Sequence, residues 1–121
     1  MPNTTVVDRV TEAFDSDSPV HRFRQNRVSE FLTSDEGNPS GGKSSGQGYE
    51  INWQNGVQEP TGAILEDVLA TCVDRLEFFQ ASKFSSRENA LAITHIQEAL
   101  HWLNHRTMER RRRGVEGSYR A

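Results

Sequence analysis

The chain has 121 residues, a net charge of −3, 34% hydrophobic residues and a mean hydropathy of −0.73. An acidic protein of this size is an unusual partner for long nucleic acid, and no apolar run is long enough to span a membrane. The sequence begins without a signal-peptide core, so we expect a cytoplasmic protein. The length suggests one domain, and so few apolar residues make a thin core, which favours an oligomer.

Charge is distributed unevenly. Residues 106–121 carry six Arg and two Glu, a local charge of +4. A local cationic patch suits a small anion or one acidic partner. The single cysteine, Cys72, excludes an intrachain disulfide and fits a reducing cytosol. Because Cys72 lies on an apolar helical stripe, we expect a small buried hydrophobic residue and not a catalytic thiol.

The N-terminal part predicts two weak helices and a linker. Apolar spacing favours a helix over residues 4–14 and another over residues 19–33, with Ser18 as its cap and a proline at its first position. Residues 34–48 are rich in Gly, Ser, Asn and Pro, which predicts a linker. Residues 1–48 are therefore expected to form an N-terminal extension.

Residues 49–54 (YEINWQ) predict a short strand that ends in a turn. An Asn-Gly pair follows the segment and is a strong turn signal. The apolar side chains alternate along the strand and share one face: Tyr49, Ile51 and Trp53.

Two helices follow. Residues 62–81 carry apolar side chains at steps of three and four, which predicts an amphipathic helix. Ser85 is the expected cap of a second helix over residues 87–113, with Glu88 reaching back to complete a capping box. Gly114 stands where a helix-ending glycine belongs.

The short connection predicts that these helices are antiparallel neighbours. The expected fold class is therefore mainly α with a short β element (α+β). Residues 49–121 would form a strand region followed by a helical hairpin.

The second helix carries a seam at alternating steps of three and four. Its first part resembles a coiled-coil seam, and its last part continues with three arginines. If copies of the helix associate there, the arginines converge and suit a phosphate ligand. The alternative is a solvated basic helix end, which the helix dipole favours. The seam residues are Asn89, Ala92, Ile96, Ala99, Leu103, Arg106, Arg110 and Arg113.

A second candidate site lies at the turn of the hairpin. Phe79, Lys83, Arg87 and Asn89 are expected together at this end. An aromatic face beside cations and an amide can hold a base and its phosphates. The alternative is that the aromatic residues simply belong to the core.

The sequence predicts neither an enzyme nor a metal site. His101 and His105 lie four apart with Glu98 nearby, but no fourth metal ligand is evident. No assembled nucleophile and base, Gly-rich phosphate loop or paired-cysteine motif appears. We therefore expect no cofactor and no catalytic residues.

Five short segments of the sequence resemble those of a known family. They are INWQNG, DRLEFFQ, RENALA, THIQEALHWL and RT-x-x-R-x-x-RGVEG, in this order within residues 51–118. This string resembles the hairpin domain shared by phage anti-Thoeris and anti-CBASS signal sponges. It is more similar to the anti-Thoeris branch, which has a strand region before the hairpin and the RGVEG ending.

The resemblance implies a phage-encoded protein of the bacterial cytoplasm that binds cyclic nucleotide or cyclic ADP-ribose signals without cleaving them. It also implies a homo-oligomer, a dimer or a hexamer. Phe79 and Asn89 match an ADP-ribose-type pocket between hairpins of a dimer. Arg106 and Arg110 match a cyclic trinucleotide pocket where three C-terminal helices meet. The competing hypotheses are a nucleic-acid-binding or phage regulatory protein that uses the Arg-rich helix, and an assembly module without a ligand.

Overall fold

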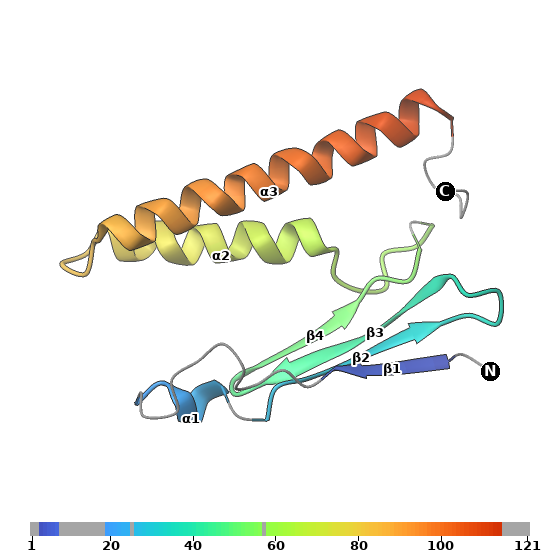
Figure 1. The fold of residues 1–121 in the computed structure, drawn as a ribbon, viewed down its shortest axis with the longest axis horizontal. Coiled ribbons are helices and arrows are strands. Elements are labelled where there is room, and N and C mark those ends of the chain that lie inside the picture. Colours follow the sequence, from blue (N-terminus) through green and yellow to red (C-terminus); the bar gives the residue numbers. More distant parts are fainter. Residues whose placement is uncertain (1–2, 8–18, 25, 57, 115–121) are drawn as a thin grey trace. The chain divides into compact units, whose positions relative to one another are not determined.

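The computed structural model describes residues 3–7, 19–24, 26–56 and 58–114 and divides the chain into two compact units, Met1–Ala63 and Ile64–Ala121. The first unit contains a four-stranded sheet and a one-turn helix, and the second contains two long helices (Figure 1). The α+β class predicted from sequence is confirmed, with a larger sheet than the short β element expected. The elements of the first unit are β1 (Asn3–Val7), α1 (His21–Arg24), β2 (Val28–Thr33), β3 (Pro39–Gly46) and β4 (Tyr49–Trp53).

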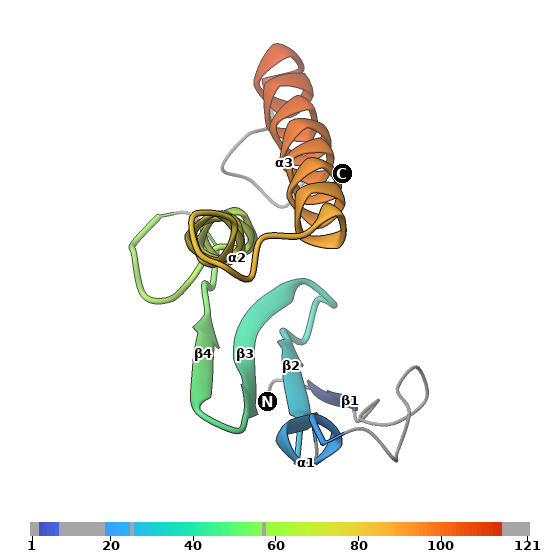
Figure 2. The same ribbon diagram turned by 90° about the vertical axis from the view of Figure 1, so that its left-hand side faces the viewer.

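All neighbouring strands are antiparallel and follow the order β1-β2-β3-β4, as Figure 2 shows. Two residues, Gln47 and Gly48, connect β3 to β4, and the positive φ of Gly48 (82°) is the conformation that such a tight turn requires. The predicted strand over residues 49–54 is confirmed by β4. It belongs to the sheet unit, whereas the sequence had suggested a division after residue 48.

The predicted N-terminal helices are largely wrong. Residues 3–7 form β1, and the rest of the helix expected over residues 4–14 lies outside the described residues, as does the expected cap Ser18. Of the helix expected over residues 19–33, only the single turn α1 is helical, and β2 follows it. Apolar spacing in segments this short fits either element, and β-branched residues favour the strand.

The predicted linker over residues 34–48 is also wrong, because it contains the central strand β3. Its glycines are needed for close approach. A Cβ on Gly42 (φ 133°) would come within 2.1 Å of the carbonyl oxygen of Glu30 on β2. A Cβ on Gly46 would come within 2.5 Å of the Tyr49 ring on β4. Glycine in a strand often marks such contacts, and here it was mistaken for flexibility.

A hydrogen-bonded chain crosses one face of the sheet. The indole Nε1 of Trp53 donates to the hydroxyl of Ser44 at 2.7 Å, and the hydroxyls of Ser44 and Ser29 are 2.7 Å apart. Ser44 is buried, so these partners satisfy a hydroxyl that water does not reach. The small side chain of Ser44 thus links three strands.

The segment after β4 folds back onto the end of this strand. Gln54 accepts hydrogen bonds from the backbone N–H groups of Thr61 (2.8 Å) and Gly62 (2.7 Å), and its amide nitrogen donates to the carbonyl oxygen of Glu59. A Cβ on Gly62 would lie 2.6 Å from the carbonyl oxygen of Asn52, so this approach requires glycine. Residues 62–64, which the sequence assigned to the next helix, are held outside it.

The second unit consists of α2 (Leu65–Gln80) and α3 (Arg87–Arg112), which pack against each other and run in opposite directions (Figure 1). Gly114 has a φ of 73° and donates to the carbonyl oxygen of Arg111, so its predicted role at the helix end is confirmed. No helix in the described part of the chain is long and apolar enough to cross a membrane.

The core of this unit is thin. Val73 is the one buried hydrophobic residue in the described parts of the chain, and no residue of α3 is buried. Apolar side chains spaced along the two helices are half-buried: Leu69 and Leu76 on α2, and Ala92, Ile96, Ala99 and Leu103 on α3.

Candidate functional site

The connection between α2 and α3 is fixed by Gln80. The side-chain amide of Gln80 donates to the carbonyl oxygen of Ser86 at 2.9 Å, and its oxygen accepts from the backbone N–H of Ser86 at 2.8 Å. Both residues are half-buried. This reciprocal pair joins the last residue of α2 to the residue before α3 and sets the geometry of the hairpin end.

Ser86 is the cap of α3, and the capping box predicted from Ser85 and Glu88 is wrong by one residue. The hydroxyl of Ser86 accepts from the backbone N–H of Asn89 at 3.0 Å. The third helical residue is therefore Asn89, which cannot act as the reciprocal glutamate of a capping box. Gln80 of the neighbouring helix takes that role, because it accepts the N–H of the cap residue.

Phe79 and Asn89 lie on either side of this connection, as the sequence suggested. Phe79 is the second-last residue of α2, Asn89 is in the first turn of α3, and both are half-buried. The amide nitrogen of Asn89 donates to the carbonyl oxygen of Phe84 at 3.3 Å. The side-chain oxygen of Asn89 accepts no hydrogen bond from a described residue, so it is available to an amino group of a ligand.

Lys83 and Arg87 are both exposed at the same end of the hairpin. The Lys83 ammonium lies 5.3 Å from the centre of the Phe84 ring, and Phe84 is 64% exposed. Arg87 begins α3 and has no ion pair with a described residue. The end of the hairpin therefore combines exposed rings with cations, which suits a ligand that has both an aromatic base and an anion.

Arg75 also belongs to this cluster, although the sequence reasoning missed it. Its guanidinium carbon lies 4.7 Å from the centre of the Phe79 ring and 5.5 Å from that of Phe78. The two rings meet edge to face with centroids 6.3 Å apart, and Phe78 is 64% exposed. The four-residue spacing between Arg75 and Phe79, one helical turn, is the signal that could have predicted this contact.

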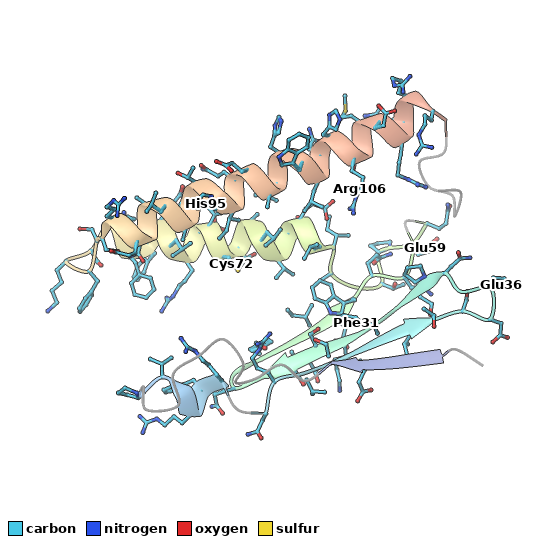
Figure 3. The ribbon with its side chains drawn as sticks, in the orientation of Figure 1. Phe31, Glu36, Glu59, Cys72, His95 and Arg106 are labelled. Atoms are coloured by element: carbon cyan, nitrogen blue, oxygen red, sulfur yellow. The ribbon has the colours of Figure 1, made fainter. Side chains whose placement is uncertain are left out.

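The second candidate site comprises Arg106, Arg110 and Arg113. The first two lie on the C-terminal overhang, which we define as residues 103–112 of α3, and Arg113 is the residue directly after it. Because α3 has 26 residues and α2 has 16, α3 extends past the beginning of α2 by about 15 Å at 1.5 Å per residue (Figures 1 and 3). Arg106 and Arg113 are exposed, whereas Arg110 is half-exposed and in line with Leu103. The structure thus places two of the three arginines on the overhang and the third at its end.

The overhang also contains an ion pair. Glu109 accepts two hydrogen bonds from the guanidinium of Arg112, one of them 3.1 Å long. The hydrogen bond from Arg112 and the positive charges of Arg112 and Arg113 lower the pKa of Glu109, and the same hydrogen bond raises the pKa of Arg112. Arg112 is therefore partly neutralised by Glu109 within the helix.

The histidines do not assemble a metal site in the described part of the chain, which holds no cluster of three metal-ligating side chains. His101 and His105 instead flank Trp102 edge to face, with ring centroids 5.7 and 5.8 Å from that of Trp102. Trp102 is 65% exposed.

The expectation that Cys72 is buried is wrong, because the cysteine is exposed on α2 (Figure 3). The face of α2 that packs on α3 includes Leu69, Val73 and Leu76. The stripe predicted from sequence ran through Cys72, one position away from Val73, so the thiol falls outside the packed face.

Comparison with known families identifies the class of protein. The Acb2/Tad1 hairpin domain matches residues 47–108, which include β4, α2 and all of α3 but its last turn. This is more than half of the chain. The protein therefore belongs to the Acb2/Tad1 hairpin-domain family, and the resemblance seen in the sequence is confirmed.

Within this class, the chain is similar to Thoeris anti-defense 1 of Bacillus phage SBSphiJ7. The two proteins are 50% identical over 72 residues, which cover 57% of this chain and 51% of the phage protein. The aligned part thus spans about half the length of this relative.

Proposed function

We propose that this protein is a phage anti-defence sponge that binds small cyclic nucleotide immune signals, holds them and does not cleave them. The signals would be glycocyclic ADP-ribose isomers, cyclic oligonucleotides or both, and their capture would keep Thoeris or CBASS effectors inactive. Membership of the Acb2/Tad1 hairpin-domain family and similarity to a Thoeris anti-defense protein support this role.

The observation that carries the proposal is the combination of groups at the hairpin end. A half-buried Phe79 ring offers a stacking face, and the Asn89 carboxamide has a free acceptor. Lys83 and Arg87 supply positive charge beside them. Stacking, amide hydrogen bonding and cations are the three interactions that recognise a base with attached phosphates.

We further propose that the protein works as a homo-oligomer, a dimer or a hexamer. A 26-residue helix without a buried residue leaves much apolar surface in water, including Leu91 (42% exposed), Trp102 (65%) and Met108 (53%). Covering such surface with further copies is a common source of stability for small chains. Light scattering at several concentrations tests this, and a monomer at all of them would contradict it.

In such an assembly the C-terminal overhang would form a second site. Three copies of Arg106 and Arg110 would bring about six guanidinium groups to the three phosphates of a cyclic trinucleotide. The expected result of Arg106→Ala with Arg110→Ala is loss of trinucleotide binding while ADP-ribose-type binding is retained. Equal weakening of both ligand classes would contradict two separate sites.

The experiment that tests the sponge function measures binding and recovery in the same sample. Wild-type protein is incubated with glycocyclic ADP-ribose, binding is measured by calorimetry, and the heat-denatured sample is analysed by mass spectrometry. We expect stoichiometric binding and intact ligand at every time point. Cleaved product that accumulates with time would make the protein an enzyme and overturn the proposal.

The site itself is tested with Phe79→Ala and Asn89→Ala combined. We expect weaker binding of glycocyclic ADP-ribose with an unchanged oligomer, because the variant loses the stacking face and the amide. If the variant binds as tightly as wild type, the two residues are only structural.

The same titrations address the nucleic-acid alternative, which rests on the Arg-rich end of the second helix, residues 106–113. A protein that binds long nucleic acid through this segment loses affinity steeply with salt and shows no preference for cyclic nucleotides. Tight binding of DNA or RNA without any binding of cyclic ligands would favour that alternative.

A further inference from the structure

We propose that Arg75 is a ligand-binding residue of the hairpin-end site and that its guanidinium holds a phosphate of the bound nucleotide. This inference rests on the proposed function and adds to it the residue that recognises the anion. None of the reasoning from sequence pointed to Arg75.

The first argument is the position of the guanidinium. It lies over both Phe79 (4.7 Å) and Phe78 (5.5 Å), so two rings hold the side chain one helical turn from the stacking residue. A cation–π contact does not use the N–H donors of a guanidinium in conventional hydrogen bonds. These donors match the paired oxygens of a phosphate.

The second argument is the lack of a competing acceptor. Although Asp74 and Glu77 are close in sequence, Arg75 forms no ion pair or hydrogen bond with a carboxylate among the residues that the structure describes. Arg112, by contrast, is engaged by Glu109. Among the described residues, Arg75 contacts ring faces and no carboxylate, so its charge is open to a phosphate.

The third argument is proximity to the base site. A nucleotide that stacks on Phe79 brings its phosphates within the length of one ribose of the ring, and Arg75 touches the same ring. Lys83 and Arg87 lie beyond the end of α2 on the connection and on α3. Of these three cations, Arg75 is the one whose contact with the Phe79 ring the structure shows.

The test compares Arg75→Gln, Arg75→Lys and a control by calorimetry with glycocyclic ADP-ribose. Arg22→Gln is the matched control, because Arg22 also lies over a phenylalanine ring (Phe23, 5.3 Å) but in the sheet unit. Arg75→Gln loses charge-assisted hydrogen bonds to the ligand, so its affinity for glycocyclic ADP-ribose should be about tenfold to a hundredfold lower than that of wild type. Arg75→Lys should recover part of this loss, and Arg22→Gln should bind like wild type.

Thermal unfolding of the ligand-free variants separates binding from folding. An exposed cation–π contact contributes little to stability, so we expect the free variants to unfold close to wild type. If Arg75→Gln is folded and binds like wild type while Phe79→Ala with Asn89→Ala loses binding, the inference fails and the proposed function stands. If wild type itself binds no glycocyclic ADP-ribose, both fail. If Arg75→Gln unfolds early, Arg75→Lys decides, since a binding loss without early unfolding supports the inference and unchanged binding overturns it.

Discussion

Replacing Gln80 with alanine should loosen the hairpin end. The substitution removes both hydrogen bonds to the backbone of Ser86, at 2.9 and 2.8 Å. A neutral hydrogen bond contributes about 0.5–1.5 kcal/mol, so the pair should contribute about 1–3 kcal/mol to the free energy of unfolding. At roughly 4 °C per kcal/mol for a chain of this size, Tm should fall by about 4–12 °C.

Thermal and urea unfolding of Gln80→Ala measure this change. Gln97→Ala is the matched control. Gln97 is exposed on α3, so this substitution removes the same kind of side chain where it makes no tertiary contact. Ser86→Ala adds a second comparison. It removes the helix cap and should cost about 1 kcal/mol by itself while the hydrogen bonds from Gln80 to the backbone remain.

The same variant should also weaken ligand binding at the hairpin end, because Gln80 fixes how Phe79 approaches Asn89 across the connection. A Tm within 1 °C of that of the Gln97→Ala control would refute this reasoning, since it would mean that water replaces both hydrogen bonds at no cost.

Three further perturbations have defined outcomes. Gly42→Ala should destabilise the sheet unit by more than about 2 kcal/mol in urea unfolding, because a backbone carbonyl of the next strand occupies the Cβ position, whereas Gly37→Ala pays only for its positive φ. Ser44→Ala should lower the free energy of unfolding by about 1–3 kcal/mol and shift the NMR resonance of the Trp53 indole N–H, which donates to the Ser44 hydroxyl in wild type. An unshifted resonance would contradict this hydrogen bond. Glu109 should titrate below 4.5 by NMR, so its stabilising effect is present above that pH and is lost as pH falls through the lowered pKa, and Arg112→Gln should return the pKa toward 4.5.

The helical unit could be predicted from sequence because its signals are long and redundant. Sixteen and 26 residues of helical spacing, a connection too short for other topologies and Gly114 at the end all agree. The errors there are local. The cap is Ser86 and not the predicted Ser85, because Gln80, six residues before Ser86, supplies the reciprocal hydrogen bond. The capping-box pattern covers only the first turn of a helix, so it does not include a partner on the preceding helix.

The sheet unit could not be predicted in the same way. β3 is a central strand made largely of glycine and serine, and such a composition has no apolar alternation. It forms because its neighbours on both sides satisfy its backbone and because Gly42 and Gly46 leave room for Glu30 and Tyr49. These are long-range reasons, which a single sequence does not display.

The candidate site was predicted in part. Phe79 and Asn89 lie on the two sides of the connection, as the spacing suggested. Arg75 was missed because an arginine in mid-helix reads as ordinary solvated charge, and only the placement of its guanidinium over two rings distinguishes it. The spacing of the arginines at the end of α3 is visible in the sequence, whereas only the structure shows that α3 is ten residues longer than its partner helix.

The chain has two tryptophans, and each unit contains one. Trp53 is half-buried and donates to Ser44 within the sheet, whereas Trp102 is 65% exposed beside two imidazole rings of α3. The two indoles therefore emit from different surroundings, and replacing either one with phenylalanine leaves an intrinsic fluorescent reporter for a single unit. Unfolding curves from the two single-tryptophan proteins would coincide only if the sheet and the helices unfold together. Intrinsic tryptophan fluorescence can therefore measure, without an added label, how cooperatively the two units unfold.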